Sequence, residues 1–201
     1  MKSNLLLLAV VTLLTASCGN TQKQNDMQTN ETLEVLKTRR SIRAYRDEMP
    51  DKSLIDRITE AGTYAPTGKG RQSPIIVAVT NKAVRDRLSQ LNARIMGADT
   101  DPFYGAPVVL IVLAERQSPH RVYDGSLVMG NLMNAAHAVG LGSCWIHRAK
   151  EVFDLPEGKA LLKEWGIEGD YEGIGNCIIG YSAQEAPQPK PRKANYVTRV
   201  D

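Results

Sequence analysis

Residues 108–115, VVLIVLAE, constrain the fold more than any other segment of the chain. Seven of these eight residues are apolar, and polar side chains do not alternate with them. A strand that is apolar on both faces must be covered on both faces, because each face would otherwise expose apolar surface to water. The segment therefore predicts a buried strand within a sheet that has covering layers.

Other segments of the chain extend this pattern. Apolar β-forming runs predict strands, and apolar residues at helical spacing predict helices between them. The predicted strands span residues 75–80, 108–115, 143–147 and 175–181, and the predicted helices span 51–65, 81–95, 125–139 and 157–165. The helix at 125–139 is apolar nearly all round, which indicates burial in a core or between subunits. The alternation predicts a layered α/β or α+β domain.

The first 30 residues are predicted to lie outside the folded domain. An apolar run over residues 5–14 and small residues up to position 17 are typical of a signal peptide over residues 1–17. The small residues before Cys18 resemble a lipoprotein signal, so we expect Cys18 to be lipidated and the protein to be anchored at the periplasmic or cell-surface side of a bacterial envelope. Ordinary secretion is the alternative. Residues 18–30 are polar and predict a tether to a domain over 31–201.

Cysteine and histidine usage argues against a structural zinc site and against a zinc hydrolase. Only three histidines are present, and neither CxxC nor HExxH occurs. Cys144 and Cys177 lie in apolar segments, which favours buried free thiols, while an oxidising compartment would permit a disulfide. The chain also lacks GxGxxG after its first strand and lacks the P-loop motif, so the usual nucleotide fingerprints are missing.

The segment KTRRSIRAYR, residues 37–46, holds five cations in ten residues. The formal net charge of the whole chain is only +3, so the positive charge is local. A local cluster favours a small anionic ligand over nucleic acid, whose binding proteins carry a larger basic excess. Guanidinium groups bind phosphate through two hydrogen bonds, and Ser41 adds a hydroxyl donor. A solvated helix end is the alternative.

Two further segments are candidates for ligand contact. In YAPTGKGRQSP, residues 64–74, Pro66 stops a helix and the glycines let the backbone approach a ligand, so N–H groups and the Thr67 hydroxyl can bond a polar ring edge. An ordinary helix-to-strand loop is the alternative. The closing segment, residues 182–201, contains three prolines and is predicted to be extended, with an end that can add to a sheet.

These segments in this order resemble the nitroreductase family of flavoproteins. The resemblance runs from about Leu33 to Arg192 and is carried by RRSIRAY, APTGKGRQSP, GAPVVLIV, GLGSCWI and IIGYSAQEAPQPKPR. It implies an α+β, three-layer, nitroreductase-like fold with a central mixed sheet flanked by helices. It also implies a homodimer that exchanges its C-terminal extension and holds FMN non-covalently at two interface sites.

The resemblance also implies which residues bind FMN. The phosphate contacts would come from Arg39, Arg40, Ser41, Arg43, Lys190 and Arg192. The flavin contacts would come from Pro66, Thr67, Gly68 and Gly70 of the other subunit, and from Cys144, Trp145, Ile146 and His147. No side chain is expected as an essential acid or base, so we assign no catalytic residue and no metal ligand.

The chain departs from the family pattern at three places. Gly70 stands where the family often has Asn, which removes a side-chain donor and acceptor near the flavin. Ser73 and Pro74 replace the usual Pro-Trp pair, which changes a packing contact. His147 falls where some members have an acidic residue, so substrate preference is expected to differ.

The implied activity is that of an FMN-dependent oxidoreductase. Hydride from NADH or NADPH would pass through the flavin to nitroaromatics, quinones or similar flat acceptors, with donor and acceptor alternating in one pocket. The alternative is a lipid-anchored protein that holds flavin or another ligand without turnover. A third class, nucleic-acid binding through the basic segment, would require salt-dependent retention on DNA.

Overall fold

The computed structural model of the protein describes residues 30–201. Its centre is one four-stranded sheet, in the order β1-β2-β4-β3. The strands are β1 (Pro74–Val79), β2 (Val108–Glu115), β3 (Gly142–Ile146) and β4 (Tyr171–Gly180). The helices are α1 (Glu31–Thr38), α2 (Lys52–Thr63), α3 (Lys82–Met96), α4 (Arg121–Ala138), α5 (Ala149–Asp154) and α6 (Pro156–Glu164), and a 3-10 turn, η1, spans Gly68–Gly70.

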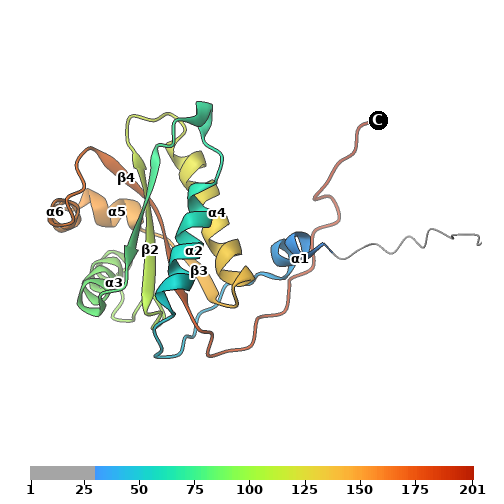
Figure 1. The fold of residues 1–201 in the computed structure, drawn as a ribbon, viewed down its shortest axis with the longest axis horizontal. Helices are drawn as coiled ribbons and strands as arrows, with labels where there is room; N and C mark the ends of the chain where they lie inside the picture. The colour runs from blue at the N-terminus through green and yellow to red at the C-terminus, as the bar shows by residue number, and fades with distance from the viewer. Residues whose placement is uncertain (1–29) are drawn as a thin grey trace, which may run out of the picture.

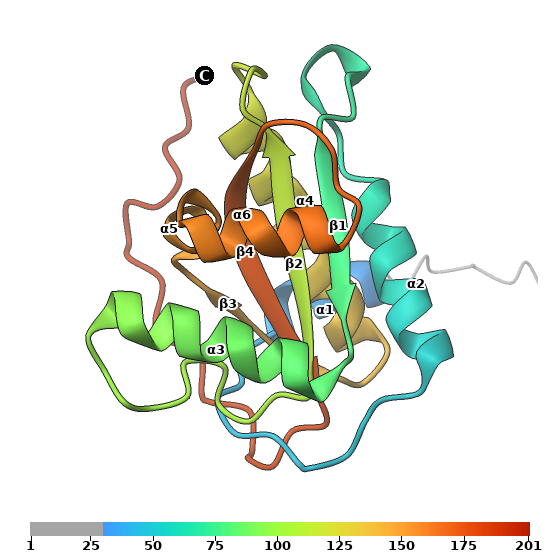
Figure 2. The same cartoon turned by 90° about the vertical axis from the view of Figure 1, so that its left-hand side faces the viewer.

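Three layers make up the body of the molecule. The sheet stands between α2 and α4 on one face and α3, α5 and α6 on the other (Figure 1). Viewed from the second face, α3 and α6 cross in front of the strands (Figure 2). Strand β2 explains this arrangement, because Ile111 and Leu113 enter the core beside α3, α5 and α6, while Leu110 and Val112 enter the core beside α2 and α4. The predicted three-layer α+β fold is confirmed.

The expected mixed sheet is wrong for the four named strands, whose sheet is antiparallel throughout. All three strand pairs, β1–β2, β2–β4 and β3–β4, are antiparallel. The parallel pairing within residues 30–201 is a single bridge between Ser41 and Ser143. Tyr45, which follows Ser41 in the basic segment, forms an antiparallel bridge with Ser182. These bridges attach the basic segment to the body.

Element boundaries agree best where the sequence is most apolar. Strand β2 covers the predicted residues 108–115, and α3 begins one residue later than predicted because Asn81 is its N-cap, with a side chain that accepts from the Val84 N–H. Strand β4 begins four residues earlier than predicted, at Tyr171, and α4 begins four residues earlier, at Arg121. Helix α5 was not predicted.

The two cysteines lie on opposite faces of the sheet and are both free. Cys144 belongs to the core beside α3, and Cys177 belongs to the core beside α4. Side chains on opposite faces of a sheet point apart, so these thiols cannot pair without moving the backbone. Burial raises the pKa of the Cys177 thiol to about 12, which keeps this thiol protonated and unreactive. The prediction of free thiols is confirmed, and the disulfide alternative is wrong.

Two segments, called here the arms, project from the body: α1 and residues 185–201. Helix α1 has no buried residue, and every residue of 185–201 is exposed. Both arms lie on the same side of the molecule (Figure 1). The exchange of the C-terminal arm between subunits stays a prediction. The predicted signal peptide and most of the tether lie outside the described residues, and no helix within 30–201 is long and apolar enough to span a membrane.

Candidate functional site

The basic segment runs alongside the start of β3. Ser41 forms the parallel bridge to Ser143, and the Ile42 N–H donates to the Ser143 carbonyl over 3.0 Å. Ile42 is buried and packs so closely on Gly142 that a Cβ at this glycine would lie 3.0 Å from Ile42. The hydrogen bond and the packing fix the backbone of the segment, so Arg43 follows directly beside the edge of β3.

The closing segment begins beside the basic segment. The Arg46 N–H donates to the Tyr181 carbonyl, the Ala183 N–H donates to the Ala44 carbonyl, and the Arg43 N–H donates to Gln184 Oε1. The two ends of the folded domain therefore meet at Arg43.

A cavity of about 460 Å³ opens at this place. Its lining includes Arg43, the segment from Cys144 to Arg148, and residues of the loop that follows α3. The volume is within the range of small-molecule sites, roughly 300–1,000 Å³. The cavity brings together five of the residues predicted to bind a cofactor: Arg43, Cys144, Trp145, Ile146 and His147.

The loop after α3 forms one side of the cavity, and Asp101 organises it. The Asp101 carboxylate accepts from Arg85 Nη2 over 2.5 Å and from Ser89 Oγ over 2.5 Å, and it also accepts the N–H groups of Phe103 and Gly105. Burial alone would raise the pKa of Asp101, but these hydrogen bonds hold it below its usual value. These hydrogen bonds therefore fix the loop to α3 through groups of the chain itself.

The opposite side of the cavity is the turn between β3 and α5. Arg148 adopts a left-handed backbone conformation with φ 73°, which costs a residue other than glycine on the order of 1 kcal/mol. Asn92 of α3, fully buried, bonds both Arg148 and His147, and Asn176 of β4 lies against the same turn. Neither asparagine stands out in the sequence as a site residue. The signal for Asn92 was its place one turn after Leu88 on the apolar stripe of α3, where an amide needs a buried partner.

The arginines at the end of α1 have different surroundings. Arg40 Nη1 donates to the carbonyls of Lys37 and Arg39, both over 2.8 Å, so Arg40 caps the C-terminus of its own helix. Arg39 Nη1 is buried and has no hydrogen-bond partner among residues 30–201. A buried N–H without an acceptor is costly, and an anion would satisfy it.

His137 of α4 ties the end of α1 to the body. The Thr38 hydroxyl donates to the Glu34 carbonyl over 2.6 Å, so its oxygen accepts from His137 Nε2 over 2.8 Å. This assigns the ring proton to Nε2, because a hydroxyl has one hydrogen to donate. Burial and the nearby charges of Arg39 and Arg40 lower the pKa of His137.

The loop after α2 is closed by its own hydrogen bonds. The Gly68 N–H donates to the buried Asp124 over 2.9 Å, the Gly70 N–H donates to the Thr67 carbonyl, and the Gln72 N–H donates to Thr67 Oγ1. These N–H groups are therefore not available to a ligand, contrary to the expectation from the sequence. Gly70 has φ +64°, which strains any residue with a Cβ, although a Cβ there would meet no atom within 4 Å.

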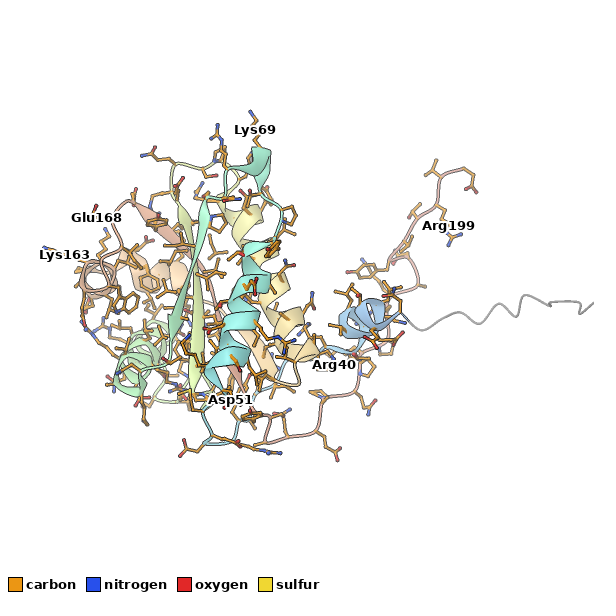
Figure 3. All side chains as sticks on the ribbon, in the orientation of Figure 1. Arg40, Asp51, Lys69, Lys163, Glu168 and Arg199 are labelled. Carbon is orange, nitrogen blue, oxygen red and sulfur yellow. The ribbon has the colours of Figure 1, made fainter. Side chains whose placement is uncertain are left out.

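This loop lies far from the basic segment within one chain. Lys69 marks the loop at the upper end of the body, and Arg40 lies beside the lower half of the body (Figure 3). Thr67 lines a second cavity, of about 570 Å³, between α2 and β1.

Comparison with known proteins agrees with this architecture. The model of the Nitroreductase family matches residues 36–181. The chain belongs to the nitroreductase family. A nitroreductase with bound FMN from Bacteroides fragilis NCTC 9343 is similar, with a TM-score of 0.79 and 30% identity over 86% of this chain and 100% of that chain.

Two further relatives extend the comparison. A nitroreductase with bound FMN from Desulfitobacterium hafniense DCB-2 shares the fold, with a TM-score of 0.77 and 24% identity over 86% of this chain and 99% of that chain. A protein named NADH dehydrogenase/NAD(P)H nitroreductase from Methanothermobacter thermautotrophicus is 29% identical over 63% of this chain and 71% of its own length.

In this nitroreductase-family chain, the predicted site residues fall into three groups. Arg39, Ser41 and Arg43 follow one another along the basic segment, and Arg43 shares a cavity with the turn after β3. The loop from Pro66 to Gly70 lies apart from them, and Lys190 and Arg192 are exposed on the C-terminal arm. One chain therefore assembles only part of the predicted site.

Proposed function

We propose that this protein is an FMN-dependent oxidoreductase. The observation that carries the proposal is the placement of the basic segment along β3, which puts Arg43 into the same cavity as the turn at Trp145–Arg148. A cationic group at one side of a cavity and a segment of backbone at the other match a ligand that joins a phosphate to a flat polar ring.

The residues present fit FMN. Arg39, Ser41 and Arg43 would hold the phosphate, and the unpartnered Nη1 of Arg39 is a donor that such an anion would satisfy. The segment from Cys144 to His147 would lie along the isoalloxazine ring. When bound, FMN supplies the redox chemistry, since its ring takes up a hydride and passes the electrons on. The protein would bind and orient the ring, and Arg43 would place positive charge at the cavity, where it would stabilise negative charge on a bound ligand.

We further propose that the working unit is a homodimer. The loop from Pro66 to Gly70 and the cavity at Arg43 lie apart in one chain, so a site that includes both requires a second copy. The outer surface of α4 exposes Tyr123 and Leu127, and α1 exposes Leu36, which are side chains that a partner would cover.

Substitution of Lys190 and Arg192 tests whether the C-terminal arm contributes to the phosphate site. Replacing both by alanine is expected to weaken FMN binding about tenfold, because two phosphate contacts are lost. Fluorescence titration of FMN measures the change, and the matched control is Lys193→Ala with Arg199→Ala on the same arm. Equal affinities of the wild type and the Lys190/Arg192 variant would contradict a role for the arm at the phosphate.

NADH or NADPH is proposed as the electron donor, and nitroaromatics, quinones or similar flat molecules are proposed as acceptors. The relative named as an NAD(P)H nitroreductase supports the donor. The alternative, a protein that holds flavin without turnover, is favoured by one feature: Gly70 offers no side chain where the family often has Asn. Anaerobic mixing with NADH or NADPH separates the two functions, because bleaching of bound flavin supports the enzyme and an unchanged spectrum supports the binder.

A lipid anchor at Cys18 is proposed for the cellular location. Its support is the sequence of residues 1–18 alone. In cells, Cys18→Ser is expected to move the protein from the membrane fraction to the soluble fraction. Continued membrane association of this variant would contradict the lipoprotein proposal.

A further inference from the structure

The turn between β3 and α5 is held by two buried asparagines from other elements. Asn92 Nδ2 donates to the His147 carbonyl over 2.9 Å, and Asn92 Oδ1 accepts from Arg148 Nε over 2.8 Å. Asn176 Nδ2 lies 3.4 Å from the carbonyls of Ile146 and His147. Asn92 is 0% exposed, and Asn176 is 2% exposed. The shorter bonds belong to Asn92, which therefore sets the position of the turn.

These contacts determine where the N–H groups of the turn point. The peptide unit is planar and trans, so its C=O and N–H point in opposite directions. The His147 carbonyl points inward to Asn92, and the Arg148 N–H in the same peptide unit therefore points away from the core. The Ile146 carbonyl points toward Asn176 in the same manner, which directs the His147 N–H outward.

Both outward N–H groups are free to bind a ligand. Across residues 30–201, neither the His147 N–H nor the Arg148 N–H has a hydrogen-bond acceptor. Both residues line the cavity of about 460 Å³, and His147 is exposed. Two adjacent donors at a cavity wall suit a ligand with acceptor atoms along one edge of a ring.

The left-handed conformation of Arg148 also depends on Asn92. This residue joins the turn to α5 at φ 73°, and its Nε bond to Asn92 is the side-chain contact that holds it there. Without Asn92, Arg148 loses this support and the His147 carbonyl loses its donor. Both changes free the same peptide unit to rotate.

We propose that Asn92 is a positioning residue for the flavin ring. It fixes the His147–Arg148 peptide so that two backbone N–H donors face the acceptor atoms of the ring edge. This inference rests on the proposed function, because it requires FMN in this cavity. Asn92 itself is fully buried and acts through the turn.

The test uses the full folded domain with Asn92→Ala and Asn92→Asp. Asn92→Ala removes both hydrogen bonds, and Asn92→Asp keeps an acceptor for Arg148 but removes the donor to the His147 carbonyl. Each variant is expected to bind FMN about tenfold more weakly, the loss of about one hydrogen bond. Riboflavin binding should weaken by the same factor, because the effect is on the ring and not on the phosphate.

A second readout separates positioning from general loosening of the fold. The flavin that remains bound to each variant should show visible absorbance maxima and a midpoint potential that differ from those of the wild type. The matched control is Asn131→Ala, which removes another amide-to-carbonyl bond, from Asn131 Nδ2 to the Ala61 carbonyl, away from this cavity. This control should leave the spectrum of bound flavin unchanged.

The outcomes are distinct. An unchanged affinity, or an unchanged spectrum and potential of the bound flavin, overturns the inference, as does an equal spectral change in Asn131→Ala. If Asn92→Ala does not fold, Asn92→Asp decides by the same criteria. If the wild type binds neither FMN nor riboflavin, the proposed function is wrong. If the wild type binds flavin and the Asn92 variants bind it equally well, only the role of Asn92 is wrong.

Discussion

The body and the arms of this molecule differ sharply in burial. In β2, the seven apolar residues from Val108 to Ala114 are 0% exposed, and both faces of the strand are covered by helices. Helix α1 has no buried residue, and residues 185–201 are all exposed. The body therefore has its own core, while the arms have almost nothing to pack against within one chain.

The difference separates stability from function. The body supplies the hydrophobic burial that stabilises the fold. The arms carry or adjoin the cations proposed to bind phosphate, namely Arg39 at the end of α1, and Lys190 and Arg192 on the C-terminal arm. Ordering such exposed segments has an entropic cost, which a second copy of the chain and a bound anion would offset.

The largest expected difference is in the free energy of unfolding, between a substitution in the core of the body and a substitution in an arm. Ile111→Ala should lower the free energy of unfolding by about 3 kcal/mol, because it leaves a cavity in a fully buried strand. Leu36→Ala on the exposed arm α1 should change it by less than about 0.5 kcal/mol in the monomer. Urea unfolding at low protein concentration without flavin measures both. Similar losses in the two variants would contradict the claim that the body, and not the arms, stabilises the monomer.

Arg43 joins the body to the phosphate end of the proposed site. Arg43→Ala should weaken FMN binding about tenfold to a hundredfold, since it removes a charged donor. Riboflavin, which has no phosphate, should bind this variant and the wild type about equally. Arg46→Ala is the matched control three residues further along the basic segment. A loss that is equal for FMN and riboflavin would place Arg43 away from the phosphate.

Substitutions at Gly68 and Gly70 test how tightly the loop after α2 is packed. A Cβ at this position would lie 2.5 Å from the ring of His120, so Gly68→Ala must displace the loop or the ring. We expect a loss of about 1 kcal/mol in stability, in the range of overpacked sites. Gly70→Asn in the same loop should cost less than Gly68→Ala, because no atom lies within 4 Å of the added Cβ, and the remaining cost is the backbone strain at φ +64°, which Asn bears better than most residues. Thermal unfolding compares the two, and equal losses would contradict the packing argument.

The smallest expected effect concerns His137 and pH. Its pKa is lowered in the folded protein, so below about pH 6.5 the unfolded chain binds a proton that the folded protein does not. Stability should therefore fall as the pH drops from about 6.5 toward the folded pKa, by less than about 1 kcal/mol for this partly exposed group. His137→Gln should remove this part of the pH dependence, and the exposed control His147→Gln should retain it. Urea unfolding at pH 7.5 and 5.5 checks the difference.

The sequence predicted the fold well where a single force dominates. Strand β2 was predicted to the residue, because a continuous apolar run admits few other structures. The start of β4 was missed because Gly173, two residues before the predicted start at Gly175, looks like a turn residue. In the structure these glycines admit close neighbours, with the Ala149 backbone against Gly173 and the Trp145 ring against Gly175. Such contacts join distant segments and leave no local pattern.

The candidate site was predictable only where its residues form a local pattern in the sequence. The basic segment and the turn at Cys144–His147 were found because their residue types and order resemble a family. Asn92 and Asn176 were missed, since their function depends on carbonyl groups that the fold brings to them. The N–H groups of Gly68 and Gly70 were expected to be free, and the turn that consumes them was not visible in the sequence.

The most direct test of the central claim is a fluorescence titration of flavin-free protein with FMN, with riboflavin as the comparison. We expect saturable binding of one FMN per chain, at least tenfold tighter than the binding of riboflavin, with a visible spectrum that changes on binding. Absence of saturable binding, or equal affinity for FMN and riboflavin, would contradict a phosphate site built from the basic segment beside β3.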